Sequence, residues 1–231
     1  MEKLSLKLSS FTISDALKAE SDDRQFKAIE LLIGKISSKD FIFPLIICNA
    51  LVGYQLSWTW EEYWEEFAKY AIDYKFPKKY SFEILYSFFK DFLPKSKCNK
   101  RLLNMKIPRL KKAEGLLGSL SGNEIYYYEN LLELQLVLSK EMHQDKGSKT
   151  ILFAIKMFIY AARIFFAKLI LAPKEIWIPL DSRLAKIEAI YNTNNLSRQK
   201  YWEIISEEIW IPRVHLDAIL WTKCNEYICN W

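Results

Sequence analysis

The sequence predicts an all-α protein, and three observations support that prediction. Apolar residues recur at helical spacing along most of the 231 residues, no stretch alternates apolar and polar residues as a half-buried strand does, and only six glycines are available for tight turns. Hydrophobic residues make up 51% of the chain, which is enough to fill a sizeable core and excludes disorder as a description of the whole protein.

The expected helices follow one another with short connections. Their ranges are 22–37, 40–56, 58–73, 80–93, 125–141, 149–169, 181–191 and 197–208, followed by a last helix after Pro212. Thr59 and Glu62 match the capping box that starts a helix, and Pro94 is expected to stop one. The basic stretch 95–112 is expected to be turn-rich, because Pro108 interrupts it.

Composition narrows the classes of function. The net charge of +5 is compatible with a polyanionic partner but too small to indicate one, and neither G-x-G-x-x-G nor G-x-x-x-x-G-K-[ST] occurs. With two histidines and no clustered ligands, we expect no metal, iron–sulfur cluster or other cofactor. The apolar segment 151–172 contains three basic residues, each costly in a bilayer, so a buried helix of a soluble, cytoplasmic protein is expected.

Lys149 stands where the polar turn HQDKGS becomes an apolar helix. The exposed N–H groups and the dipole at a helix start disfavour a positive charge by about a few tenths of a kcal/mol or more. Lysine is therefore a poor choice for stabilising this helix. Its amine is either an ordinary surface charge or a nucleophile.

The helix that begins at Lys149 carries further basic residues on one face. Lys149, Lys156 and Arg163 are seven residues apart, and Phe153 lies on almost the same side. Such a row suits a groove for a phosphate backbone, and it suits a solvated edge of a buried helix equally well.

Two carboxylates complete the candidate site. Asp181 opens the helix SRLAKIEAI, where aspartate is a favoured N-cap, and a fixed carboxylate there could also stabilise positive charge developing on a sugar. Asp217 and Trp221 are four residues apart on one helical face. An acid beside an indole suits a nucleobase, although a tryptophan on an apolar helix is more often part of the core.

Taken together, these residues resemble the archaeal 8-oxoguanine DNA glycosylases, a branch of the helix–hairpin–helix glycosylase superfamily. The resemblance rests on KTILFAIKMF (149–158), IPLDSR (178–183), HLDAILW (215–221) and, less specifically, NALVGYQLS with EEYW (49–64). It covers about residues 20 to 225, and the lysine-to-aspartate separation matches this branch. The turn DKGSK departs from the superfamily's glycine-rich hairpin because it has one glycine.

The resemblance implies a single glycosylase domain, 1–231, of two helical lobes with the active site in the cleft between them and a hairpin near 141–149. It implies that Lys149 attacks C1′ of the damaged nucleotide, that Asp181 activates the lysine, and that Phe153 and Trp221 stack on the flipped base. The resemblance also implies that Asp217, Gln25 and Trp64 contact the base and that the turn at Gly147 grips the DNA phosphate. From their spacing on the helix, Lys156 and Arg163 are expected to contact the DNA backbone as well.

The expected function is therefore a bifunctional 8-oxoguanine DNA glycosylase and AP lyase that acts as a monomer on double-stranded DNA, with activity on single-stranded DNA left open. Three alternatives stay open at this point. They are a glycosylase for another oxidised base, a non-catalytic helical DNA-binding module, and a helical scaffold that binds proteins through its tryptophans.

Overall fold

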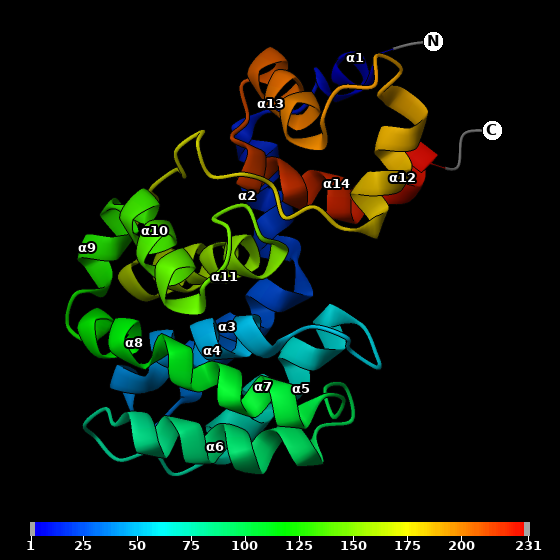
Figure 1. Ribbon diagram of the computed structural model, residues 1–231. Helices are drawn as coiled ribbons and strands as arrows, with labels where there is room; N and C mark the ends of the chain where they lie inside the picture. The colour runs from blue at the N-terminus through cyan, green and yellow to red at the C-terminus, as the bar shows by residue number, and fades with distance from the viewer. Residues whose placement is uncertain (1–2, 229–231) are drawn as a thin grey trace. The chain divides into compact units, whose positions relative to one another are not determined.

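The computed structural model describes residues 3–228, and within them the protein is helical with no β-strand, which confirms the predicted all-α class. The described residues form two compact units (Figure 1). The central unit comprises Arg24–Ile170, and the terminal unit comprises residues 3–23 together with residues 171–228. The expectation of one domain with two lobes remains a prediction.

The central unit is built around its longest helix, α11 (Lys149–Phe166), which packs against α3 (Arg24–Lys35) and α4 (Ile42–Val52). Helix α4 is buried along its whole length, and Pro44 is tolerated because it lies in the first turn. The remaining helices of this unit are α5 (Trp60–Asp73), α6 (Phe82–Lys95), α7 (Leu103–Leu110), α8 (Glu114–Leu120), α9 (Glu124–Glu129) and α10 (Leu131–Met142), with 3-10 turns at Lys39–Phe41 and Lys111–Ala113.

The capping box predicted at the start of α5 is present. The Thr59 hydroxyl accepts a hydrogen bond from the N–H of Glu62, and the Glu62 carboxylate accepts one from the N–H of Thr59. The expectation for 95–112 was wrong, because α7 occupies part of that stretch and contains Pro108 near its end. The expected helix 125–141 is divided at Asn130 into α9 and α10.

The terminal unit joins the two ends of the chain around one apolar core. Helix α2 (Ile13–Asp22) packs against α14 (Arg213–Ile228), although the two are far apart in sequence (Figure 1). Helices α1 (Leu4–Leu8), α12 (Ser182–Tyr191) and α13 (Arg198–Ile209) complete the unit. Its core includes Trp202, Leu216 and Leu220, each exposed by 1% or less. No helix in residues 3–228 is long and apolar enough to cross a membrane.

Candidate active site

Lys149 is the first residue of α11, as predicted, and its side chain is exposed. The preceding turn, residues 143–148, is fixed by side chains of α10. Ser139 donates a hydrogen bond to the carbonyl of Gln144 (2.5 Å), and the Gln135 amide donates one to the carbonyl of Lys146 (2.9 Å). The start of α11 is therefore held in place, although Ser148 offers no side-chain cap to it.

A cavity of about 390 Å³ opens beside Lys149 within the central unit. Phe153, one turn further along α11, lies on its wall and packs against Trp60, with ring centroids 4.2 Å apart. The same cavity is lined by Gly53, Tyr54, Gln55, Leu56, Trp58 and Thr150. The structure thus brings two predicted residues, the lysine and a stacking ring, to one hollow of the central unit.

Gly53 is required for the wall of this cavity. A Cβ atom added to Gly53 would lie 2.5 Å from Cζ3 and 2.8 Å from Cη2 of Trp60. A rigid indole cannot yield to such a contact without moving as a whole, so glycine lets Trp60 reach α4 and support Phe153.

A buried lysine, Lys106, packs against Tyr54, and nothing in the sequence indicated that this lysine is buried. Lys106 is fully buried, donates a hydrogen bond to the Asn99 amide oxygen, and lies 4.8 Å from the centroid of the Tyr54 ring. Burial lowers the pKa of Lys106 to about 8. Arg109 lies over the same ring and donates to the hydroxyl of Thr150, which ties this cluster to the first turn of α11.

The two further base-contacting residues predicted in the central unit are both buried. Gln25 lies on α3 with 2% of its surface exposed, and Trp64 lies on α5 with none exposed. The indole N–H of Trp64 has no hydrogen-bond acceptor among the described residues. A buried donor without an acceptor costs about 1–3 kcal/mol, so its retention calls for an explanation.

The predicted row of basic residues on α11 does not form one exposed face. Lys149 is exposed, Lys156 is buried with 2% exposed, and the Arg163 guanidinium packs over the ring of Phe26 at 4.6 Å. These three side chains therefore do not form one exposed phosphate-binding surface along α11. Direct DNA contacts of Lys156 and Arg163 remain predictions.

The turn at Gly147 also differs from the expected phosphate grip. The N–H of Gly147 donates to a carboxylate oxygen of Asp145 at 2.7 Å, and the N–H of Ser148 donates to the Asp145 carbonyl. Both donors already serve the turn itself, so a phosphate at Gly147 would have to displace an anionic acceptor.

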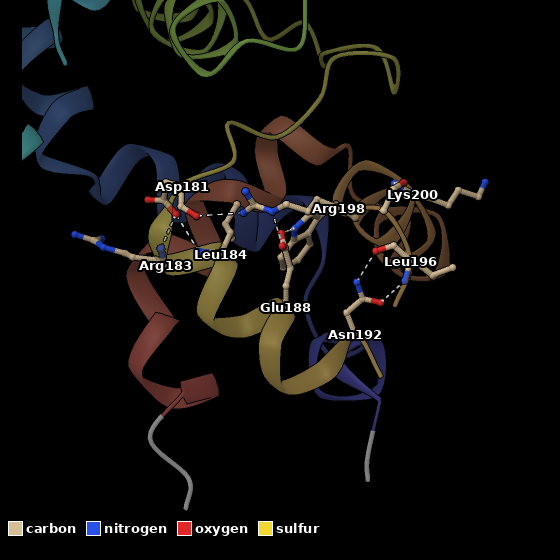
Figure 2. Close-up of polar contacts among 10 residues, drawn as sticks. Asp181, Arg183, Leu184, Glu188, Asn192, Leu196, Arg198 and Lys200 are labelled. Carbon is tan, nitrogen blue, oxygen red and sulfur yellow. Dashed lines mark hydrogen bonds and ion pairs between the residues drawn. The ribbon is translucent and has the colours of Figure 1, made fainter. Parts of the chain in front are cut away.

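In the terminal unit, Asp181 is the N-cap of α12, as the sequence predicted. Its Oδ1 atom accepts hydrogen bonds from the N–H groups of Arg183 and Leu184, both at 2.9 Å (Figure 2). The other carboxylate oxygen, Oδ2, has no hydrogen-bond partner in the part of the chain that the structure describes. One oxygen is therefore structural and the other is available for chemistry.

A network that sequence reasoning missed supports the loop before α12. Glu188 accepts a hydrogen bond from the Arg198 guanidinium at 2.5 Å (Figure 2). It accepts a second one from the indole N–H of Trp202, also at 2.5 Å. The same guanidinium donates to the backbone carbonyl of Asp181 at 3.2 Å. The buried carboxylate of Glu188 thus holds Arg198, which in turn fixes the backbone of the candidate catalytic residue Asp181.

Helix α14 carries Asp217, which is 7% exposed, and Trp221, which is half-buried one turn later. Its position is fixed by His215, whose Nε2 accepts a hydrogen bond from the N–H of Ala172 at 3.0 Å. The proton on Nδ1 therefore faces Glu20 of α2, 2.8 Å away, and both side chains are 1% exposed. This pair joins residues 195 positions apart and could not be read from local patterns.

The predicted residues divide between the units. The central unit holds Lys149, Phe153, Gln25, Trp64, Gly147, Lys156 and Arg163, and the terminal unit holds Asp181, Asp217 and Trp221. Among residues 3–228, apart from the undescribed side chain of residue 224, no group of three or more His, Cys, Asp or Glu side chains is arranged to hold a metal ion.

Comparison with known proteins identifies the family. The family described as AGOG, N-glycosylase/DNA lyase, matches residues 6–227. The chain is similar to the N-glycosylase/DNA lyases of Thermococcus kodakarensis (39% identical over 205 residues, 87% of this chain and 75% of that protein) and Nanoarchaeum equitans (39% over 215 residues, 93% and 86%).

The fold is also similar to a crystal structure of Pyrobaculum aerophilum 8-oxoguanine DNA glycosylase in complex with 8-oxoguanosine. The TM-score is 0.81 at 24% identity, covering 96% of this chain and 86% of that one. The match over nearly the whole chain confirms the resemblance drawn from the three motifs, and the protein belongs to the AGOG family of N-glycosylase/DNA lyases.

Proposed function

We propose that this enzyme excises 8-oxoguanine from double-stranded DNA as a monomer and then cleaves the strand, with Lys149 as the nucleophile. The observation that carries the proposal is the exposed amine of Lys149 on the wall of a cavity that also displays the ring of Phe153. An amine beside an aromatic face is what attack on the sugar of a stacked, flipped nucleotide requires.

The chemistry proceeds in two stages. The Nζ lone pair of Lys149 attacks C1′ as the bond from C1′ to the base nitrogen breaks, and the base leaves with that electron pair and takes up a proton. The sugar ring then opens to a Schiff base between Nζ and C1′. Loss of a C2′ proton expels the 3′ phosphate by β-elimination, and water finally releases the enzyme.

Asp181 contributes a carboxylate to the first stage. With Oδ1 engaged in capping α12, Oδ2 accepts the proton that the lysine amine must lose and stabilises positive charge on the sugar at the transition state. The proposal requires residues of both units to act on one nucleotide.

Recognition of the base rests on stacking and on buried polar groups. Phe153 and Trp221 would hold the two faces of the base, and Asp217 would accept its N–H groups, because a carboxylate is an acceptor only. The unpaired indole N–H of Trp64 and the amide of Gln25 would serve the remaining edge. An acceptor supplied by the substrate would explain why Trp64 is left unsatisfied.

A borohydride trap tests the proposal. A duplex with one 8-oxoguanine is incubated with enzyme and sodium borohydride, and a covalent protein–DNA adduct is expected because reduction converts the Schiff base to a stable amine. Lys149→Gln should give no adduct. Lys140→Gln serves as a matched control, since it removes one exposed lysine charge from α10 without touching the cavity.

Two outcomes would contradict the assignment. Absence of an adduct with wild-type enzyme would reject 8-oxoguanine as substrate, and a panel of duplexes with other oxidised bases would then identify the lesion. An adduct formed by Lys149→Gln would reject Lys149 as the nucleophile.

A further inference from the structure

Arg183 connects two residues of the candidate site inside the terminal unit. Its backbone N–H donates to Oδ1 of Asp181 at 2.9 Å, and its guanidinium carbon lies 3.3 Å from the centroid of the Trp221 ring. Figure 2 shows the Arg183 side chain extending away from the contacts of Glu188 and Arg198. A single residue therefore links the N-cap of α12 to the aromatic ring on α14.

The location of Arg183 is unfavourable for the stability of its own helix. It is the second residue of α12, where the helix dipole disfavours a cation. No carboxylate lies within 4.0 Å of its guanidinium in the described part of the chain. The contact that remains is the one with the indole face, and cation–ring contacts of this kind are attractive within about 6 Å.

A planar ring has two faces, and Arg183 takes one of them. At 3.3 Å the guanidinium is in van der Waals contact with the indole, so nothing else can stack on that face. A nucleobase that stacks on Trp221 must use the opposite face. The arginine thus occupies one face of Trp221 before the base arrives and restricts the base to the opposite face.

We propose that Arg183 is a positioning residue that holds Trp221 in the orientation needed to stack on the flipped base. The proposal rests on the proposed function, which places the base against Trp221. Because Arg183 acts through the ring and not on the reacting atoms, it should govern the affinity for the base and leave the rate of the bound complex nearly unchanged.

The expected loss follows from the strength of the contact. A partly exposed cation–ring pair is worth about 0.5–1 kcal/mol, which corresponds to an affinity change of about two- to fivefold. Arg183→Ala should therefore weaken binding of free 8-oxoguanosine by this factor, measured by isothermal titration calorimetry. Arg183→Lys should recover part of the loss, because an ammonium keeps the charge but lacks the flat stacking surface.

Lys186→Ala is the matched control. It removes one exposed positive charge from the same helix, a charge that lies over no aromatic ring in the described part of the chain, and should leave nucleoside affinity unchanged. Single-turnover excision from an 8-oxoguanine duplex should show a raised half-saturating enzyme concentration for Arg183→Ala, with the rate at saturation within about twofold of wild type.

The possible results separate the two proposals. If the wild type neither binds 8-oxoguanosine nor forms the borohydride adduct, the proposed function fails and the role of Arg183 fails with it. If the wild type does both, then unchanged or tighter nucleoside binding by Arg183→Ala overturns the role of Arg183 alone. A loss of equal size in Lys186→Ala would also overturn it, because the effect would then come from net charge.

Discussion

Asp181 offers a test that separates a structural role from a catalytic one within a single side chain. Its Oδ1 atom caps α12 through two hydrogen bonds of 2.9 Å, while the proposed chemistry uses the negative charge on Oδ2. Asparagine is as good an N-cap as aspartate but carries no charge. Asp181→Asn should therefore keep the cap and lose the catalysis, whereas Asp181→Ala should lose both.

The expected losses of stability and of excision rate follow from the two roles of the Asp181 carboxylate, capping α12 and carrying a negative charge. Loss of the cap in Asp181→Ala should cost about 1–2 kcal/mol of unfolding free energy, because one oxygen serves two N–H groups. Asp181→Asn should cost only the interaction of the charge with the helix dipole, about 0.3–1 kcal/mol. Both variants should lower the single-turnover rate of base excision by about 10²–10⁴-fold, the usual contribution of a positioned general base.

Urea unfolding and single-turnover excision from an 8-oxoguanine duplex measure the two effects separately. Ser197→Ala is the control, because Ser197 caps α13 in the same unit and should affect stability but not the excision rate. If Asp181→Asn excises the base at the wild-type rate, Asp181 is a cap and nothing more. If Asp181→Ala is as stable as Asp181→Asn, the structural part of the reasoning is wrong.

Substitutions at three other positions probe the supports of the site. Gly53→Ala should displace Trp60 and lower base affinity together with stability, measurable by calorimetry with 8-oxoguanosine and by urea unfolding; unchanged values would show that the ring has room to move. Lys106 has a folded-state pKa of about 8 against 10.5 for the unfolded chain, so between these values the unfolded state binds more protons and stability rises with pH. The unfolding free energy of wild type relative to Lys106→Met should therefore increase by up to about 3 kcal/mol from pH 8 to 10.5, and a pH-independent difference would refute this. Glu20→Ala should destabilise the protein by about 1–3 kcal/mol in urea, because the buried Nδ1–H of His215 loses its acceptor, while Glu20→Gln, which keeps an acceptor, should cost less; equal losses would contradict the assigned tautomer.

The sequence correctly predicted those helix starts and caps that depend on a few adjacent residues. The capping box at Thr59, the N-cap at Asp181 and the start of α11 at Lys149 were all correct, because each depends on a few adjacent residues. Helices α1 and α2 lie before the first helix expected, although Thr12 and Asp15 form a capping box that signals α2. Aspartate at the third position performs the role usually read from glutamate or glutamine, so the motif was overlooked.

The helical spacing of residues predicted which side of a helix they share, but not whether that side is exposed to solvent or buried by neighbouring elements. Residues seven apart lie on one side of a helix, and Lys149, Lys156 and Arg163 do share a side of α11. Neighbouring elements decide whether that side is open, and they bury Lys156. Contacts such as Glu20 with His215, or Arg183 with Trp221, depend on tertiary packing in the same way, so neither spacing nor composition could indicate them.

The two proposed catalytic residues lie at helix N-termini. The helix dipole stabilises the carboxylate of one and destabilises the ammonium group of the other. A carboxylate at the start of α12 stabilises that helix, so Asp181 would be favoured there even in a protein without activity. A lysine at the start of α11, after a Ser148 that makes no side-chain cap, opposes the dipole and costs stability. Stability therefore accounts for Asp181 without any chemistry but gives no reason for Lys149. An exposed amine kept at an unfavourable position on the wall of a cavity is consequently the stronger structural argument for catalysis, and replacing it by an uncharged glutamine should stabilise the fold slightly while abolishing the trapped adduct.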